Sequence, residues 1–474
     1  MRVGADFFSF RLRPHQFINE CGKLASHIGL WRFPMDRVQA QVARLMRSIL
    51  LRPGAEDKLP AAQFFAGRGK AFTFSGGVGL TWWYSPDTFN AIDTVTALII
   101  ETEQEFKDCD TESVNNIVTS TLQKVCLDSP LFNGDDVVFG RKSNLFECRG
   151  AISVIEFTRT ILEEIKHNLR SVIGKRCTAY PLSRFKGPSL SLHEEGLHLI
   201  SCGDDVAWNS FSAEGYVFDD WTPNSPFTAN SNFSFNSGYE FNYVLIGEDY
   251  GTQEGAKFAS SLKFRMFITV LFAYASEFSK YGYHKSIAQP FTNCIQFPHE
   301  TTPDNLLTLS GCGALSPFYA SDIIITDELT KKVAEWYESL NKCPSEYKQR
   351  IKKSANFFNR AMNSEDIESY INYFVALDAL FGQRGSVEAS IIAGVGNLGL
   401  DEKLKEKTSW LFDLRNELVH GGSRYISEWP KHQRYTKHFG SKPLNDLKEL
   451  AQKAILKAPS ILPVSTIDET SEQS

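Results

Sequence analysis

The sequence lacks the motifs that would assign it directly to a common class of enzyme or metal protein. Its nine cysteines, from Cys21 to Cys343, are odd in number and never spaced C-x-x-C. Zinc sites and disulfide frameworks need closely spaced or paired cysteines, so we expect neither, and reduced buried thiols instead. The chain also has no G-x-S-x-G elbow and no G-x-x-x-x-G-K-[ST] phosphate loop, which are the signatures of α/β-hydrolases and P-loop proteins.

Long apolar segments are missing as well. The longest apolar run, Met266 to Ala275, is roughly half of the ~20 residues that cross a bilayer. The first residues, Met1 to Asp6, show no basic segment followed by an apolar one, as a secretory signal would. We therefore expect a cytoplasmic protein without membrane contact.

The charges are unevenly distributed along the 474 residues. The segment from Lys342 to Ser460 holds 19 Lys+Arg and 14 Asp+Glu, whereas the remainder holds 31 and 42. A basic C-terminal part on an acidic body favours a polyanionic ligand for the C-terminal part. Ordinary fluctuation with solvated lysines explains the same numbers equally well.

Residues 1–325 predict a mixed α/β region, with a change of character near residue 178 that suggests two subdomains. Apolar spacing predicts helices over 37–51, 87–106, 114–125, 152–173 and 255–280, and a strand–turn–strand unit over 71–84. Between 178 and 246, segments rich in Phe, Tyr, Ser and Asn alternate with turns at Gly203-Asp204-Asp205 and Asn236-Ser237-Gly238. This pattern predicts antiparallel β structure, followed by the helix and by irregular sequence to about residue 321.

The remaining chain predicts an all-α bundle over 326–460, so that the fold class is α+β. Helices are expected near 327–341, 345–362, 365–381, 386–396, 401–420 and 442–457, with Ser345 as a helix cap. The polar segment 464–474 is expected to be disordered.

The most informative stretch runs from Leu411 to Gly422 at the end of the fifth of these helices. Apolar residues at helical spacing place Arg415 on the stripe that faces other protein, and glycine at 421 and 422 can end the helix in the left-handed conformation. His420 then lies in the last turn. An arginine, which binds phosphate through two donors, and a histidine, which titrates near neutral pH, suit phosphate chemistry. An arginine in a structural ion pair and a histidine that caps the helix is the alternative.

Asp378 is the lone carboxylate on the stripe formed by Ile367, Ile371, Phe374 and Phe381. A buried carboxylate needs a partner, and Arg415 or His420 can supply it. A cap, a water contact or a face turned to solvent explains Asp378 equally well.

Two further sequence segments resemble known motifs but lack the secondary structure or the spacing that these motifs need. Gly394-Val395-Gly396-Asn397-Leu398-Gly399 matches G-x-G-x-x-G, but a dinucleotide site needs a preceding strand, and both flanks here predict helix. His193 and His198 are spaced by five in a predicted hairpin, whereas zinc proteases need histidines four apart on one helix. We expect an interhelical turn and no zinc site, respectively.

Residues 345–457 resemble the HEPN superfamily, and most closely its ApeA-like branch from bacterial anti-phage systems. The resemblance is carried by Ser354-Ala355-Asn356-Phe357-Phe358-Asn359-Arg360-Ala361, by Val375-Ala376-Leu377-Asp378-Ala379-Leu380-Phe381, where relatives often carry Glu in place of Asp378, and by Arg415-Asn416-Glu417-Leu418-Val419-His420-Gly421, which matches R-x4-6-H. It covers about a quarter of the chain.

The resemblance implies a metal-independent RNA endonuclease of an abortive-infection system, which needs no cofactor. Arg415, His420, Asn416 and Asp378 are the implied catalytic residues, and RNA, with tRNA among the candidates, is the implied substrate. It further implies a homodimer or higher homo-oligomer through the bundle, and an N-terminal region that senses a phage-derived trigger or regulates the enzyme. A non-catalytic HEPN protein that only dimerises or binds RNA is the alternative.

Overall fold

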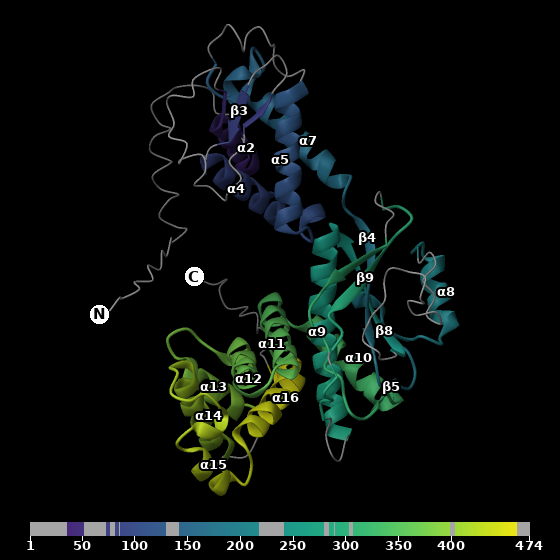
Figure 1. Ribbon diagram of the computed structural model, residues 1–474, viewed down its shortest axis with the longest axis vertical. Helices are drawn as coiled ribbons and strands as arrows, with labels where there is room; N and C mark the ends of the chain where they lie inside the picture. Colours follow the sequence, from purple (N-terminus) through teal and green to yellow (C-terminus); the bar gives the residue numbers. More distant parts are fainter. Residues whose placement is uncertain are drawn as a thin grey trace, which may run out of the picture. The chain divides into compact units, whose positions relative to one another are not determined.

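The computed structural model describes residues 36–51, 73–75, 81–84, 86–128, 142–217, 241–278, 284–288, 290–302, 307–398 and 403–461 (Figure 1). By its internal contacts the chain forms two compact units, Met1–Val95 with Lys124–Glu163, and Thr96–Gln123 with Glu164–Ser474. Helices and strands together make the fold a mixed α+β one, as the sequence predicts.

The first unit holds a small antiparallel sheet in the order β1-β3-β2, built from β1 (Ile49–Leu51), β2 (Thr73–Ser75) and β3 (Thr81–Tyr84). The two strands predicted within 71–84 are thus confirmed, whereas the turn between them lies outside the described residues. The helix predicted over 37–51 is α2 (Arg37–Ser48), which Asp36 caps by accepting from the Gln39 amide at 2.7 Å. Its expected last residues, from Ile49 on, instead form β1, because they pair with β3.

Three longer helices follow in the sequence, close to their predicted positions. They are α4 (Pro86–Thr102), α5 (Thr111–Asp128) and α7 (Val154–Arg170), with the short 3-10 helices η4 (Gln104–Phe106) and η5 (Leu145–Arg149) before α5 and α7 respectively.

The second unit is built on a six-stranded antiparallel sheet in the order β10-β9-β4-β8-β7-β6. Its strands are β4 (Gly174–Leu182), β6 (Leu190–Leu192), β7 (Leu197–Ser201), β8 (Tyr243–Gly251), β9 (Asn293–Pro298) and β10 (Thr308–Gly311). A short parallel pair, β5 (Phe185–Lys186) and β11 (Ile323–Ile324), lies beside it in the same unit. The antiparallel region predicted between 178 and 246 is confirmed.

Two expectations for this region were wrong. The strands β9 and β10 lie in the segment expected to be irregular, and β9 pairs with β4 near the middle of the sheet. Residues 205–213 form helix α8 (Asp205–Ala213) where only a turn was expected, because the Asp204 carboxylate caps the helix by accepting from the Ala207 amide at 3.1 Å. Residues 218–240 of the predicted β region lie outside the described residues. Just before them, Tyr216 makes an isolated bridge to His299.

Helix α9 (Gln253–Phe278) packs on β8 and β4 and forms the core of the unit. Among the described residues, the segment Gln253–Glu277 is the one helix long and apolar enough to cross a bilayer, but 61% of its apolar window is buried inside the protein. Most of this apolar window therefore packs inside the second unit.

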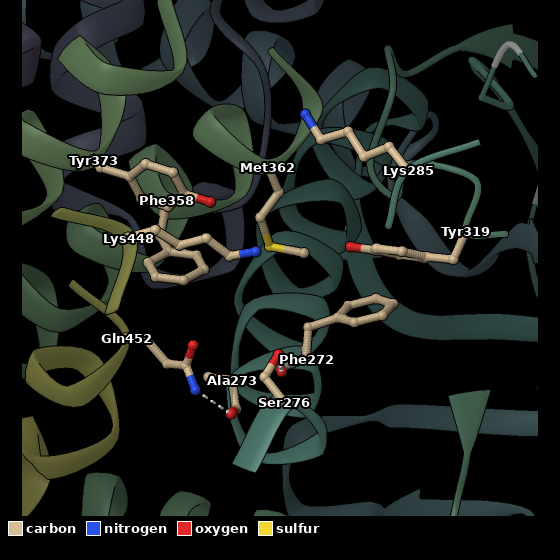
Figure 2. A pocket seen from close by; sticks show the side chains of 10 residues that line it. All are labelled: Phe272, Ala273, Ser276, Lys285, Tyr319, Phe358, Met362, Tyr373, Lys448 and Gln452. Atoms are coloured by element: carbon tan, nitrogen blue, oxygen red, sulfur yellow. Dashed lines mark hydrogen bonds between the residues drawn. The ribbon is translucent and has the colours of Figure 1, made fainter. Parts of the chain in front are cut away.

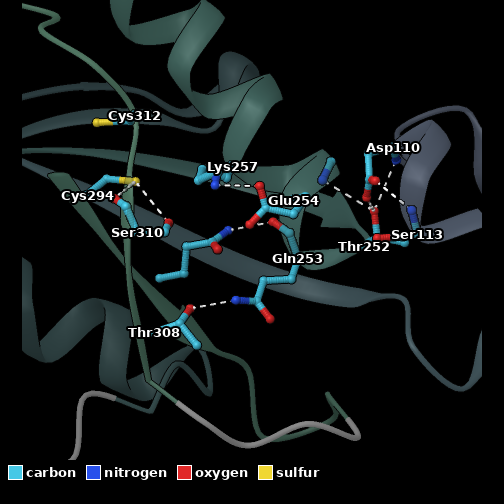
Figure 3. A network of polar contacts seen from close by, with 12 residues as sticks. Asp110, Ser113, Thr252, Gln253, Glu254, Lys257, Cys294, Thr308, Ser310 and Cys312 are labelled. Atoms are coloured by element: carbon cyan, nitrogen blue, oxygen red, sulfur yellow. Dashed lines mark hydrogen bonds and ion pairs between the residues drawn. The ribbon is translucent and has the colours of Figure 1, made fainter. Parts of the chain in front are cut away.

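Polar side chains join the start of α9 to the elements around it (Figure 3). The Asp110 carboxylate caps α5 by accepting from the Ser113 amide at 2.7 Å. It also accepts from the Thr252 hydroxyl at 2.7 Å. In the same network Gln253 donates to Thr308 of β10 at 3.0 Å. The cysteines of the described residues are all free thiols, as the sequence predicts; Cys21 lies outside these residues.

The C-terminal helices are α10 (Asp327–Lys342), α11 (Ser345–Asn363), α12 (Asp366–Phe381), α13 (Val387–Gly396), α14 (Lys403–Val419), α15 (His432–Phe439) and α16 (Pro443–Ile461), with the short η7 (Ile426–Glu428) before α15. All six predicted helices are present. The eight-residue α15 was not predicted. Ser345 was expected to be a cap but is the first helical residue, because Pro344 occupies the cap position. Helices α10, α11 and α16 pack against α9, so the bundle and the sheet share one core.

Candidate functional site

The end of α14 presents the predicted site. Gly421 adopts φ +74°, its amide donates to the Leu418 carbonyl at 3.2 Å, and the Gly422 amide donates to the Glu417 carbonyl at 3.0 Å. This pair of bonds is the Schellman motif, in which a left-handed glycine satisfies the last carbonyls of a helix. The predicted end of the helix is confirmed, with Gly421 alone in the left-handed conformation. His420 occupies the cap position that the motif fixes.

Arg415 lies half-buried on α14, on the stripe that also carries the buried Leu411 and Leu418. Its Nη1 donates to the side-chain oxygen of the adjacent Asn416 at 3.1 Å, and its guanidinium lies 5.9 Å from the centre of the Phe412 ring. No carboxylate pairs with Arg415 anywhere in the described chain. A structural ion pair, the alternative explanation for this arginine, is therefore not formed, and four of its five donors have no bond to the described residues.

His420 is exposed, and its backbone amide donates to the Asn416 carbonyl at 3.0 Å. Within the described residues no hydrogen bond or ion pair engages its ring. Asn416, one of the implied catalytic residues, accepts from Arg415 through its side-chain oxygen. The end of α14 thus holds a guanidinium fixed by a neighbouring amide and, five positions later, an imidazole open to a ligand.

Asp378 is half-buried near the end of α12, and no ion pair joins it to Arg415 or His420 in the described structure. Its carboxylate lies over the backbone of Gly382, where a Cβ would collide with it. Glycine at 382 therefore makes room for this side chain. The partner expected for Asp378 is not provided by the site, and its functional role stays a prediction.

A buried polar cluster that the sequence did not reveal holds α14 in place. The Asp446 carboxylate on α16, 7% exposed, accepts from Tyr435 of α15 at 2.8 Å and from Ser441 at 2.5 Å. It also pairs with Lys407 of α14 at 3.0 Å. One carboxylate therefore ties together three helices, one of which carries Arg415. The sequence did not reveal this contact, because Asp446 follows Arg415 by 31 positions and no local pattern links the two.

Two large apolar side chains close to His420 in the sequence are exposed. Val419 is 51% exposed and Tyr425 is 58% exposed. Tyr425 follows the helix end by a few residues, just before η7. Apolar side chains at this exposure next to a candidate site mark a contact surface when they cluster, and the sequence alone could not separate them from core residues.

The G-x-G-x-x-G string was expected to be an interhelical turn, but it is one only in part. The first three residues of the G-x-G-x-x-G string end helix α13, and helix α14 begins shortly after it. Gly394 of this string is needed for packing, because an added Cβ would lie 2.7 Å from the Cβ of Phe381. His193 lies in the short 3-10 helix η6 (His193–Glu195) that connects β6 to β7, and His198 lies in β7. Among the described residues there is no cluster of three His, Cys, Asp or Glu side chains that could hold a metal ion.

No protein family, no curated protein and no solved structure matches this chain in the comparisons. The assignment of the site therefore depends on the residues and their geometry.

Proposed function

We propose that this protein is a metal-independent RNA endonuclease of a cytoplasmic anti-phage, abortive-infection system. The observation that carries the proposal is the end of α14, where the half-buried Arg415 and the exposed, unengaged His420 stand within one helical segment. A fixed guanidinium can stabilise the charge that develops on a phosphodiester, and an open imidazole can transfer a proton. The resemblance to HEPN proteins supports the same chemistry.

The proposed reaction uses the ribose 2′-hydroxyl as nucleophile. His420 removes its proton or protonates the leaving 5′-oxygen, and Arg415, oriented by Asn416, stabilises the phosphorane. The neighbouring hydroxyl is already positioned for attack. The products are a 2′,3′-cyclic phosphate and a 5′-hydroxyl.

The reaction needs both a proton acceptor and a proton donor, whereas one chain offers one histidine here. We propose that a second copy supplies the other histidine in a homodimer. Support comes from Val419 and Tyr425, which expose apolar surface close to His420 in the sequence. In this assembly the acidic N-terminal region regulates the enzyme and receives a phage-derived trigger.

The test is cleavage of an RNA oligonucleotide with a defined site, and of the same oligonucleotide with a single 2′-deoxyribose there. We expect cleavage of the first alone, undiminished by EDTA, and a loss of about 10²–10⁴-fold in His420→Ala. Arg415→Lys should also be poor, because lysine keeps the charge but loses the two-pronged geometry. His284→Ala, which removes an exposed histidine outside the bundle, is the matched control and should cut like the wild type.

The result that contradicts the proposal is undiminished cutting of the single-deoxy substrate, or full activity in His420→Ala. A second function is then favoured by the apolar surface at Val419 and Tyr425. In that case the bundle only dimerises or binds RNA, and purified wild-type protein binds RNA without cutting it.

A further inference from the structure

A pocket lies where the bundle meets the core helix of the sheet region (Figure 2). Its walls come from α9, α11, α12 and α16 and from the segments around residues 285 and 319. Apolar side chains, among them Phe272, Phe358 and Met362, form part of the lining. The cavity volume is about 40 Å³. Because one water needs about 10–15 Å³ of such space, the pocket suits a few waters or one small polar group.

The charged side chains of the lining are of one sign. Lys285 and Lys448 contribute ammonium groups, and no carboxylate is among the lining residues. Lys285 donates to the Ser364 carbonyl at 2.6 Å and keeps two further donors. Lys448 has no acceptor within the described residues, while the neighbouring Glu449 pairs with Lys453 on the outer side of the helix. Two ammonium groups thus share a pocket that lacks a counter-charge.

The surroundings disfavour the charge on both lysines. Partial burial lowers the pKa of Lys448. Burial also lowers the pKa of Lys285, and Lys448 lowers it further, although Glu365 outside the pocket acts in the opposite direction. Both side chains remain exposed along part of their length, so a ligand can reach the ammonium groups from solvent. An anion between them would remove the repulsion and restore a hydrogen-bond partner.

Phenol groups complete the set of donors. Figure 2 shows Lys448, Tyr373 and Tyr319 directing their polar ends toward the middle of the pocket from different sides. The Tyr373 hydroxyl makes no hydrogen bond within the described residues. Burial raises the pKa of Tyr373, so its hydroxyl stays protonated and can donate. Gln452 is already engaged, because its amide donates to the Ala273 carbonyl at 2.8 Å.

We propose that this pocket binds one phosphate group, held by Lys448 and the Tyr373 hydroxyl and attracted by the charge of Lys285. The charge of the lining selects an anion, the small volume limits it to a single oxyanion group, and the phenol adds a neutral donor. The source is inorganic phosphate or the phosphate of a mononucleotide whose remainder lies outside the pocket. The site is separate from Arg415 and His420, and its occupancy does not depend on the ribonuclease proposal.

The experiment measures binding with the full-length protein and no RNA. Inorganic phosphate and adenosine 5′-monophosphate are titrated in separate arms at constant ionic strength, and the melting temperature and the heat of binding are recorded. We expect saturable stabilisation by phosphate in the wild type. Lys448→Met keeps the length of the side chain but removes the charge, and should weaken binding by about tenfold or more, because a charge-assisted hydrogen bond is lost. Tyr373→Phe should weaken it by about threefold to tenfold.

Lys453→Met is the matched control, because it removes one lysine charge from the exposed side of the same helix and should bind phosphate like the wild type. Tighter binding of the mononucleotide than of phosphate identifies a nucleotide as the source; equal or weaker binding identifies the free ion. Either result supports the proposed site if Lys448→Met weakens the binding. Absence of saturable binding in both arms, or equal binding by the wild type and Lys448→Met, overturns the proposal and leaves the ribonuclease proposal untouched.

Discussion

Replacing Asp446 by asparagine tests how firmly the helix of the candidate site is held. The carboxylate is 7% exposed and receives a lysine ammonium on one oxygen and two hydroxyls on the other. Asparagine has nearly the same shape but only one acceptor oxygen. If the amide NH₂ is turned toward Lys407, two donors face each other; if it is turned toward the hydroxyls, these must accept instead of donate. In both orientations the charge that balances Lys407 is lost.

The expected loss follows from these contacts. Losing one charge-assisted hydrogen bond costs about 1.5–3 kcal/mol, and removing one member of a buried ion pair costs about 3–5 kcal/mol. Lys407 is 21% exposed on its side chain, so water compensates part of the second figure. We therefore expect Asp446→Asn to destabilise the bundle by about 2–4 kcal/mol.

Hydrogen exchange is the appropriate measurement, because a chain with two compact units need not unfold in one step. Amides in peptides from α14 and α16 should exchange faster in Asp446→Asn by a factor that corresponds to this loss, while those in β4 change less. Glu449→Gln is the matched control on the same helix. Its ion pair with Lys453 is largely exposed, with side-chain exposures of 61% and 42%, and should be worth about 0–1 kcal/mol. Equal exchange in the two variants would refute the reasoning.

Three further predictions concern association, packing and pH. Replacing Val419 and Tyr425 together by serine should weaken the proposed dimer, measured by light scattering across a dilution series; an unchanged mass at every concentration would place the interface elsewhere. Gly394→Ala should destabilise the protein by about 1–2 kcal/mol in urea unfolding, because overpacking against Phe381 outweighs the helix propensity of alanine; a gain in stability would show that the ring moves freely. Although burial opposes the effect, hydrogen bonds lower the pKa of Asp110, so this carboxylate stabilises the fold above its unfolded pKa of about 3.9 and the contribution is lost as the pH falls through the lower, folded value. The stability difference between wild type and Asp110→Asn should therefore shrink below about pH 4, and a difference that is constant from pH 6 to pH 3 would contradict the assignment.

The helices were largely predictable because their apolar residues recur with a period that few other structures share. Helix α14 illustrates this, since Leu411, Arg415 and Leu418 predicted which side of the helix is covered, and the glycine after His420 predicted where the helix ends. Both inferences use neighbours within about two turns of the chain. The eight-residue α15 was not predicted because it is too short to show the helical period of apolar residues.

The sheet was only partly predictable because its order joins strands that are distant in sequence. The six-residue β9 is buried along most of its length, so it shows no alternation of polar and apolar residues. It becomes a strand because β4 offers it a free edge more than 100 positions earlier. Helix α8 was not predicted because of a local ambiguity: Asp204 and Asp205 suit a turn and a helix cap equally well.

The residues of the candidate site were also only partly predictable from the sequence. The residues that carry the proposed chemistry, Arg415 and His420, lie on one helix and were visible in the sequence. The residues that fix that helix, such as Asp446 and Tyr435, come from other helices and were not visible. For Asp378, helical spacing predicted a position on a partly buried stripe. It could not predict that the carboxylate lies over Gly382 instead of contacting Arg415.

The proposed phosphate pocket and the proposed cleavage site share helix α12. Tyr373 of α12 lines the pocket, and one turn earlier the Tyr370 hydroxyl donates to the Leu411 carbonyl of α14 at 2.6 Å. Phe374 adds an edge-to-face contact with Phe412, with ring centres 5.2 Å apart. A ligand alters a distant site only by the difference in its affinity for two conformations. Phosphate can therefore change cleavage only if the position of α12 differs between the active and the restrained enzyme, whereas a rigid α12 leaves the pocket as a stabilising site alone.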